Sequence, residues 1–350
     1  MRDVAVIGFA EAPNVRRTGG TTNGVEMLVP IFHEVLEQTH LARTDIGFWC
    51  SGSSDYLAGR AFSFVAAVDA IGAFPPVMES HVEMDGAWAL YEAWVKVLTG
   101  EVDVALAYGF GKSSAGDLRR VLALQMDPYT VAPLWPDSVG IAALQARLGL
   151  EAGRWTEREM AEVAVRSRAA ASSNPRAQLS GEASAEALLA QPYVSDPLRA
   201  HDCAPVTDGA AVVIIAAASR ARQLCRRPAY ITGFEHRIDT GELGARDLMT
   251  SPSAAAAGQA AGTADVDVAE LHAPFSHQEL ILRDALALGG SVRISPSGGA
   301  LAGNAMFAAG LARIGHAARQ IISGEADRAL GHATSGPALQ QNLVCVMEGG

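Results

Sequence analysis

Residues 86–106 read GAWALYEAWVKVLTGEVDVAL, and residues 310–330 read GLARIGHAARQIISGEADRAL. The two stretches lie 224 residues apart, and they share the Gly-Glu-x-Asp turn, the closing Ala-Leu and most apolar positions. In both, apolar residues recur with the period of a helix, and the turn precedes a short apolar strand. A repeat of this kind indicates two copies of one structural unit.

Two further echoes support the duplication. Residues 2–9 (RDVAVIGF) match residues 227–234 (RPAYITGF), and residues 45–50 (DIGFWC) match residues 267–272 (DVAELH) more weakly. Because strands alternate with helices in each copy, we predict an α/β fold whose sheets are covered on both faces.

The predicted halves span residues 1–225 and 226–350. Residues from about 113 to 200 have no echo and are richer in Arg, Ser and Pro, so we interpret them as an inserted helical region. The first copy then closes through residues 208–215, DGAAVVII.

Composition indicates a globular protein with a large core and disfavours a nucleic-acid partner. The chain has 350 residues, of which 49% are hydrophobic and 19% charged, enough for a large core and two domains. The low charge fraction also fits a buried oligomer interface, although small apolar residues in a large core explain it equally well. A net charge of −11 disfavours a nucleic-acid partner.

Cysteine spacing and the apolar segments argue against a metal-binding, disulfide-rich, secreted or membrane-spanning protein. The four cysteines show no C-x-x-C pair, which argues against a zinc site or a disulfide framework. The start MRDVAVIGF lacks the apolar region of a signal peptide, and the longest apolar run, residues 210–218, is too short to span a bilayer. We therefore expect a cytoplasmic protein with no membrane span and no metal ligands of its own.

Several motifs occur in the order found in one known family. They are DGAA at 208–211, ELHAPFS at 270–276, SPSGG at 295–299 and the closing Gly-Gly. Together with the duplicated halves, the chain resembles the thiolase superfamily, and most closely its sterol-carrier-type branch, often labelled nonspecific lipid-transfer proteins. The resemblance implies two duplicated βαβαβαββ halves in a five-layered αβαβα arrangement.

The resemblance also assigns candidate catalytic positions. The nucleophilic cysteine of the family falls on Glu83, within HVEMDGAWA at 81–89, and the motif histidine is present as His272. The histidine of the Gly-His-Pro motif falls on Asn304, and the second cysteine falls near His332. Because a thiolase forms an acyl-thioester on a cysteine thiolate, these replacements make ordinary thiolysis unexpected.

What remains is compatible with other chemistry on a CoA thioester. Asn304 and a suitably protonated His272 are candidate donors to a developing oxyanion, while Glu83 and His332 are candidates for moving a proton. Retro-aldol cleavage of a 3-hydroxyacyl-CoA needs only these groups. The cysteine-free relatives known as steroid side-chain aldolases catalyse it with a small OB-fold, zinc-ribbon partner, but this chain has no evident tyrosine where theirs are catalytic.

The cofactor and partner expectations follow from the same resemblance. No cofactor is expected to bind tightly, since CoA arrives with the substrate, and the loop Ser297, Gly298 and Gly299 is a candidate anion site for it. The acyl-CoA substrate, a homodimer or heterodimer through the first-half sheet, and the OB-fold protein are the expected partners.

Each candidate also has a structural explanation. Glu83 and Asp85 precede a helix, where Asp85 fits an N-cap and both carboxylates complement the helix dipole. Asn304 suits a loop with unusual backbone angles, and His332 could simply bond loop backbone. We expect His277 at the surface or behind the groups that touch substrate.

Two hypotheses from different classes result. The first is a CoA-thioester lyase of the retro-aldol type, acting on a sterol-like or other lipid side chain. The second is a non-catalytic thiolase-like subunit that pairs with a catalytic chain. A lipid carrier is a third interpretation, which the sequence supports least because it shows no separate lipid-binding domain.

Overall fold

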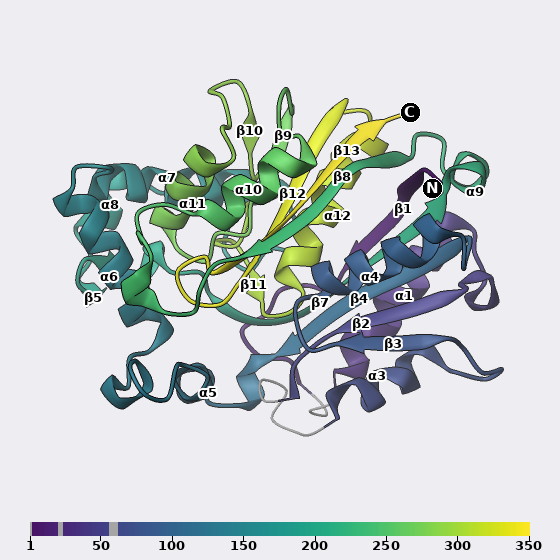
Figure 1. Ribbon diagram of the computed structural model, residues 1–350, viewed down its shortest axis with the longest axis horizontal. Coiled ribbons are helices and arrows are strands. Elements are labelled where there is room, and N and C mark those ends of the chain that lie inside the picture. The colour runs from purple at the N-terminus through teal and green to yellow at the C-terminus, as the bar shows by residue number, and fades with distance from the viewer. Residues whose placement is uncertain (1, 20–23, 56–61) are drawn as a thin grey trace.

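A computed structural model describes residues 2–19, 24–55 and 62–350. Its main sheet is built from two sets of five strands with the same order, joined at one edge (Figure 1). The first set runs β3-β2-β4-β7-β1 and the second β10-β9-β12-β13-β8. Their bounds are β1 Val4–Glu11, β2 Phe48–Gly52, β3 Glu79–Val82, β4 Val104–Lys112, β7 Val206–Ala217, β8 Ala229–Ile238, β9 Val268–Glu270, β10 Arg293–Ile294, β12 Arg328–Ser335 and β13 Gln341–Gly349.

Strand direction repeats along with strand order. In each set the first three strands are parallel, and the last two pair antiparallel. The sets meet through a short antiparallel contact between β1 and β8, with Ala5 opposite Tyr230 and Val6 opposite Ala229. The three sequence echoes map onto equivalent strands, so the predicted duplication is confirmed.

Helices form the other layers. The equivalent helices α4 (Gly86–Thr99) and α12 (Ala309–Ile322) lie between the two halves of the sheet and share one buried core with both. Helices α1 (Val25–Thr39) and α3 (Ser63–Ile71) cover the outer face of the first half, and α10 (Pro252–Ala261) and α11 (Ser276–Ala285) cover that of the second. The result is the predicted αβαβα order of layers.

The repeated turn has a physical reason. Gly100 and Gly324 end α4 and α12 with φ of 88° and 81°, in the left-handed region that favours glycine. This backbone turns the chain from the helix into β4 or β12. The central helices hold side chains such as Leu90 and Leu311 with no exposed surface, each worth roughly 1.5–3 kcal/mol of burial.

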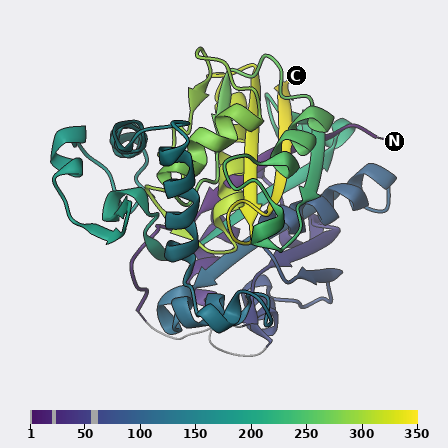
Figure 2. The same cartoon turned by 60° about the vertical axis from the view of Figure 1, so that its left-hand side comes forward.

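The inserted region is helical, as predicted, and lies at one end of the molecule (Figures 1 and 2). It contains α5 Leu118–Leu124, α6 Ser138–Glu151, α7 Glu157–Ala170, α8 Ala185–Leu189 and the small sheet of β5 Tyr193–Ser195 and β6 Leu198–Arg199. The remaining elements are α9 Ala218–Leu224, β11 Asn304–Ala305 and the 3₁₀ turns η1 Arg43–Asp45, η2 Ser113–Ala115, η3 Ala132–Leu134, η4 Ala171–Ser173, η5 Ala200–Asp202 and η6 Leu243–Ala245.

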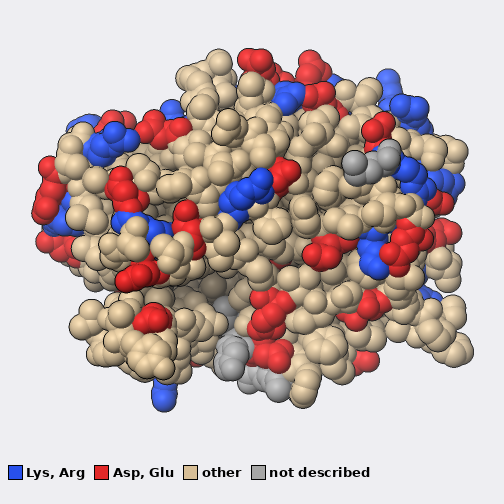
Figure 3. Space-filling model, viewed as in Figure 1, with Lys and Arg blue, Asp and Glu red and all other residues tan. Residues whose placement is uncertain are grey.

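Charged side chains of both signs are found on the face of the molecule that Figure 3 shows. On the face in Figure 3, acidic and basic side chains are interspersed and do not form a broad basic area. Among the described residues, none of the helices combines the length and the apolar character needed to cross a bilayer.

Candidate functional site

The two central helices begin at the same place, and one carboxylate caps both. Asp85 accepts hydrogen bonds from the backbone of Ala87 in α4 at 2.9 Å and from Gly310 and Leu311 in α12, both at 2.9 Å. The predicted N-cap is therefore confirmed, but it serves two helices. Burial raises the pKa of Asp85, while the three N–H groups and Arg313 oppose that shift.

His272 follows β9 and lies beside Asn304 of β11. Its Nε2 is 3.1 Å from Asn304 Oδ1, and the backbone N–H of Thr334 donates to its Nδ1 at 3.3 Å. Burial lowers the pKa of His272 to about 4, a shift that the bond to Asn304 opposes and Arg313 reinforces. The ring is thus neutral at pH 7.

These contacts fix the proton on the ring. Because the Thr334 N–H can only donate, His272 Nδ1 must accept, so Nε2 carries the hydrogen and donates to Asn304 Oδ1. Both ring nitrogens are then engaged, and His272 is not itself a free oxyanion donor. The Asn304 Nδ2 group remains, since the described part of the chain forms no hydrogen bond to it.

The backbone around Asn304 is held by two elements of the first half, β7 and α4. Asn304 pairs with Val206 of β7, and the carbonyl oxygen of Phe307 accepts from the backbone of Gly86 at 2.8 Å. This loop therefore runs past the start of α4, where the resemblance puts the family's nucleophile. Asn304 is a rigidly mounted donor, which is the requirement for stabilising an oxyanion.

His332 lies deeper, on β12. Its Nε2 is 3.0 Å from Asn342 Oδ1, and the Asn342 amide donates to Ser251, Ser253 and the backbone oxygen of Leu339. The side chain has no exposed surface, and its Nδ1 has no hydrogen-bond partner among the described residues. Burial, reinforced by nearby His272, lowers the pKa of His332 to about 3 against the effect of Asn342.

Glu83 stands apart from these groups. Its side chain is 53% exposed, and its carboxylate contacts the backbone N–H of Asp55 at 3.3 Å and Nε2 of His81 at 3.4 Å. In the described residues, no hydrogen bond links it to His272, Asn304 or His332. The structure therefore brings His272 and Asn304 into direct contact, keeps His332 close behind them, and leaves Glu83 on the edge of the first half.

The loop of Ser297, Gly298 and Gly299 is tied to the strand before His272. The carboxylate of Glu270 accepts from the backbone and the hydroxyl of Ser297, at 2.9 and 2.7 Å. Arg313 of α12 donates to that hydroxyl at 2.5 Å and to Glu270 at 3.2 Å. These contacts engage the Ser297 hydroxyl inside the protein, and a CoA-binding role for the loop stays a prediction.

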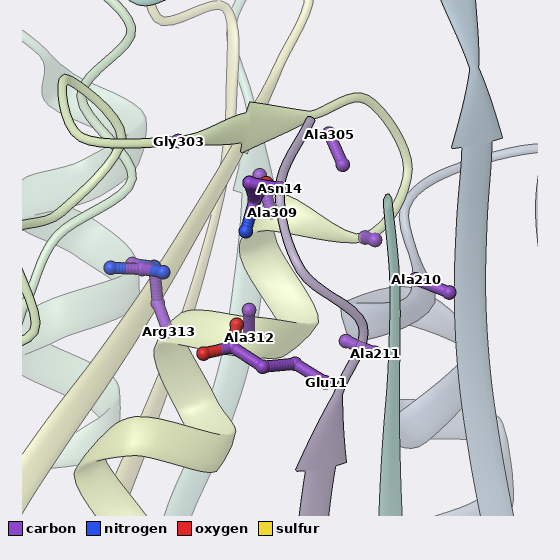
Figure 4. A pocket seen from close by; sticks show the side chains of 10 residues that line it. Glu11, Asn14, Ala210, Ala211, Gly303, Ala305, Ala309, Ala312 and Arg313 are labelled. Atoms are coloured by element: carbon purple, nitrogen blue, oxygen red, sulfur yellow. The ribbon is translucent and has the colours of Figure 1, made fainter. Parts of the chain in front are cut away.

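A small polar cavity lies beside this ion pair (Figure 4). Its volume is about 10 Å³, room for one water molecule, and its walls include Glu11 at the end of β1, Asn14 and Arg313. Burial acts to raise the pKa of Glu11, but His316, Arg313 and Arg319 outweigh it and hold the pKa at about 2. Glu11 and Arg313 could not be recognised from the sequence, because only the packing of α12 against β1 and β9 brings their charges together.

His277 is corrected by the structure. It has no exposed surface, and its Nε2 bonds Gln145 of α6 at 3.1 Å, so it is a core residue. The surface position was wrong because α6 of the inserted region covers the start of α11.

None of the four cysteines of the chain supplies a ready thiolate. Burial raises the pKa of Cys50 and of Cys203 to about 12, and it also raises the pKa of Cys225 and Cys345. A thiol with a raised pKa is a poor nucleophile at neutral pH.

Comparisons with known proteins agree on one family, although no family model matches the chain. The chain is 28% identical to an acetyl-CoA acetyltransferase of Methanothermobacter thermautotrophicus over 282 residues, which cover 72% of this chain and 73% of that protein. It is 26% identical to human sterol carrier protein 2 over 74% of this chain and 54% of that protein. It is 31% identical to the 17-hydroxy-3-oxo-4-pregnene-20-carboxyl-CoA lyase of Mycobacterium tuberculosis, over 40% of this chain and 39% of that one.

A solved structure supports the fold across the full length. The chain superimposes on a chain of the Ltp2-ChsH2(DUF35) aldolase with a TM-score of 0.80, covering 99% of this chain and 98% of that one at 18% identity. The predicted thiolase fold is confirmed.

Proposed function

We propose that this chain, which belongs to the thiolase superfamily and is similar to its sterol-carrier-type branch, is an acyl-CoA lyase that cleaves a 3-hydroxyacyl-CoA by a retro-aldol reaction. The observation that carries the proposal is the His272–Asn304 pair, a fixed hydrogen-bond donor in a site with no thiolate. An oxyanion donor without a nucleophile suits a reaction that passes through a thioester enolate.

The bond changes follow from the groups present. A base takes the proton of the 3-hydroxyl, the Cα–Cβ bond breaks, and its electron pair moves into the thioester as an enolate. The Cβ fragment leaves as a ketone or aldehyde, and the enolate takes a proton at Cα to give a shorter acyl-CoA. No free CoA is consumed.

Three of the candidate residues have a role in this scheme. The Asn304 amide donates to the enolate oxygen, and His272 orients it by donating to its carbonyl oxygen. Glu83 is the proposed base, since an exposed carboxylate can meet a substrate hydroxyl. Separation of Glu83 from Asn304 suits this scheme, because the reacting carbons must lie between the base and the oxyanion donor.

The proposed substrate is a CoA thioester with a sterol-like or other lipid side chain. The Mycobacterium tuberculosis relative is named as a lyase of such a compound, while other relatives are named as acetyltransferases. The proposed partner is a second thiolase-like chain. A small OB-fold protein is a further candidate, because the solved Ltp2-ChsH2(DUF35) aldolase is named for two components.

A second candidate function is a non-catalytic subunit. It is favoured by the complete burial of His332, which keeps that imidazole out of reach of a substrate. In that case the chain would contribute only a binding surface to a catalytic partner.

The test uses a branched 3-hydroxyacyl-CoA with a sterol-like ring and no free CoA. Mass spectrometry follows acetyl-CoA or propionyl-CoA for the wild type and for Asn304→Ala, alone and with any co-purified chain. We expect cleavage by the wild type and a loss of roughly 10²–10³-fold in kcat for the variant.

Gln223→Ala, on the exposed helix α9, is the matched control and should leave the rate unchanged. Cleavage that requires the co-purified chain and is unaffected by Asn304→Ala would favour the non-catalytic subunit. Absence of cleavage by the wild type, with or without the partner, would overturn the lyase.

A further inference from the structure

Three polar side chains, those of Ser51, His81 and Glu83, are linked by hydrogen bonds at the edge of the first half. The proposed reaction uses only Glu83. Ser51 is on β2, and His81 and Glu83 are at and just after β3. Ser51 and His81 are direct neighbours in the parallel pairing of these strands. Ser51 Oγ is 2.9 Å from His81 Nδ1, and His81 Nε2 is 3.4 Å from Glu83 Oε2.

The chemistry of the three groups determines which of them donates and which accepts in each hydrogen bond. An ionised Glu83 can only accept, so His81 Nε2 carries the hydrogen that faces it. In the neutral ring Nδ1 then holds a lone pair, and the Ser51 hydroxyl donates to it. The second carboxylate oxygen of Glu83 accepts from the backbone of Asp55, so each oxygen has one donor.

The imidazole is also held by its neighbours. Phe64 of α3 stacks on His81, with ring centroids 4.9 Å apart and an angle of 25° between the rings. Ser51 has no exposed surface, whereas the side chains of His81 and Glu83 are 19% and 53% exposed. Constraint therefore decreases from the buried hydroxyl to the exposed carboxylate.

Burial excludes the alternative that these groups form a hydrolase triad. A nucleophilic serine must reach an acyl carbon, and Ser51 is covered completely. The other carboxylates near His81 are already engaged or further back. Asp55 accepts from the backbone of Phe62 and Ser63, and Glu79 lies two residues earlier on β3.

We propose that His81 is a positioning residue that holds the Glu83 carboxylate in one orientation as proton acceptor, while the Ser51 hydroxyl donates to the other ring nitrogen and keeps the imidazole in place. This inference rests on the proposed lyase function. A base held within a narrow range of angles reacts faster than a freely rotating one, because less orientational freedom is lost in the transition state.

Two conservative variants separate positioning from folding. In His81→Gln the terminal amide nitrogen can occupy the place of Nε2 and donate to Glu83. In His81→Asn the shorter side chain reaches only the place of Nδ1, beside Ser51. Both remove the stacked ring, so a purely structural role of His81 would affect the two alike.

The measurement is kcat and KM for the CoA-independent cleavage. We expect His81→Asn to lose roughly tenfold or more in kcat with little change in KM, and His81→Gln to stay within about threefold of the wild type. His236→Asn is the control, since this ring lies on β8 and contacts Tyr91 of α4, and it should leave kcat and KM unchanged. Equal losses in the Gln and Asn variants would overturn the proposal.

A second measurement does not depend on activity. The imidazole ¹⁵N spectrum of the full chain should show His81 with its hydrogen on Nε2, and Glu83→Ala, which removes the acceptor, should bring in the Nδ1–H tautomer. A wild-type ring protonated on Nδ1 would reject the positioning role. If the wild type cleaves nothing while the tautomer is as expected, the lyase proposal fails and the orientation of Glu83 stands.

Discussion

Three buried histidines have the same arrangement, in which one ring nitrogen forms a hydrogen bond with a side-chain amide oxygen. His272 faces Asn304, His277 faces Gln145, and His332 faces Asn342. Burial lowers their pKa to about 4, 3 and 3, so all three are neutral in the folded protein at pH 5. An amide oxygen accepts from a neutral ring without demanding a charge.

The first prediction concerns stability against pH. Unfolding exposes these rings to water, where their pKa is near 6.5, so the unfolded chain binds more protons below that pH. Stability should therefore fall as pH drops from 7 to 5, by about 2 kcal/mol for each ring. His277→Gln, outside the candidate site, should remove about 2 kcal/mol of that fall.

Urea unfolding at pH 7 and pH 5 measures the effect. Gln223→Ala, on the surface helix α9, changes no titratable group and provides a comparison in which the pH dependence should match the wild type. Identical pH dependence in the wild type and in His277→Gln would contradict the assignment of a neutral, buried His277.

At the scale of elements, the joint between α4 and α12 depends on Asp85. A normal N-cap satisfies one helix, but this carboxylate accepts three backbone N–H groups from two helices. The joint lies where the halves of the sheet face each other. Loss of the Asp85 carboxylate should therefore destabilise both repeats together.

The second prediction is that Asp85→Ala lowers the free energy of unfolding by about 3 kcal/mol, because three buried donors lose their acceptor. Asp137→Ala removes a cap that serves α6 alone, through one bond to Gly140, and should cost about 1 kcal/mol. Urea denaturation of both variants tests the difference. Equal costs would mean that the shared cap has no special weight.

A close approach between elements also positions Asn304. A side-chain carbon placed on Gly109 of β4 would lie 2.1 Å from the carbonyl oxygen of Phe307, in the loop that follows β11. Only glycine lets this loop pack so near the strand. The spacing of the loop from β4 therefore sets the position of the amide donor.

The third prediction is that Gly109→Ala displaces this loop, lowers stability by about 2 kcal/mol and reduces kcat for cleavage. Gly289→Ala, at a site with no heavy atom within 4 Å of the added carbon, should change stability by less than about 0.5 kcal/mol. Thermal unfolding and the cleavage assay measure both effects. Full activity in Gly109→Ala would show that the position of this loop does not control the action of Asn304.

At the scale of the whole molecule, the outer edge of the first half is unfinished. Among the strands that the structure describes, β3 ends the path of the sheet and pairs only with β2. Apolar side chains near it are exposed, including Phe74 at 90% and Val65 at 54%. An open strand edge with apolar neighbours favours association. This supports the dimer that the family resemblance implies.

The fourth prediction is that the protein elutes as a dimer and that Phe74→Glu shifts it toward monomer, because a charge would be buried at the interface. Tyr129→Glu, an equally exposed aromatic position in the inserted region, should have no effect. Light scattering coupled to gel filtration measures both. A monomeric wild type, or an equal shift in both variants, would reject β3 as the interface.

The duplication and the absence of the thiolase nucleophile could both be recognised from the sequence alone. Apolar periodicity and the repeated Gly-Glu-x-Asp turn are local, so they could be read before any contact was known. The absence of a cysteine at Glu83 likewise needs no coordinates. The N-cap role of Asp85 followed from one residue type at the start of one helix.

How these residues act on one another depends on contacts that form only in the folded chain. The second helix on Asp85, the direction of the His272–Asn304 bond, the Arg313–Glu270 pair and the burial of His277 all join segments far apart in the chain. The same holds for His81, whose meaning depends on its neighbour Ser51 across the sheet. Sequence patterns record which face of an element is apolar, whereas hydrogen bonds between polar groups depend on distances and angles that packing alone sets.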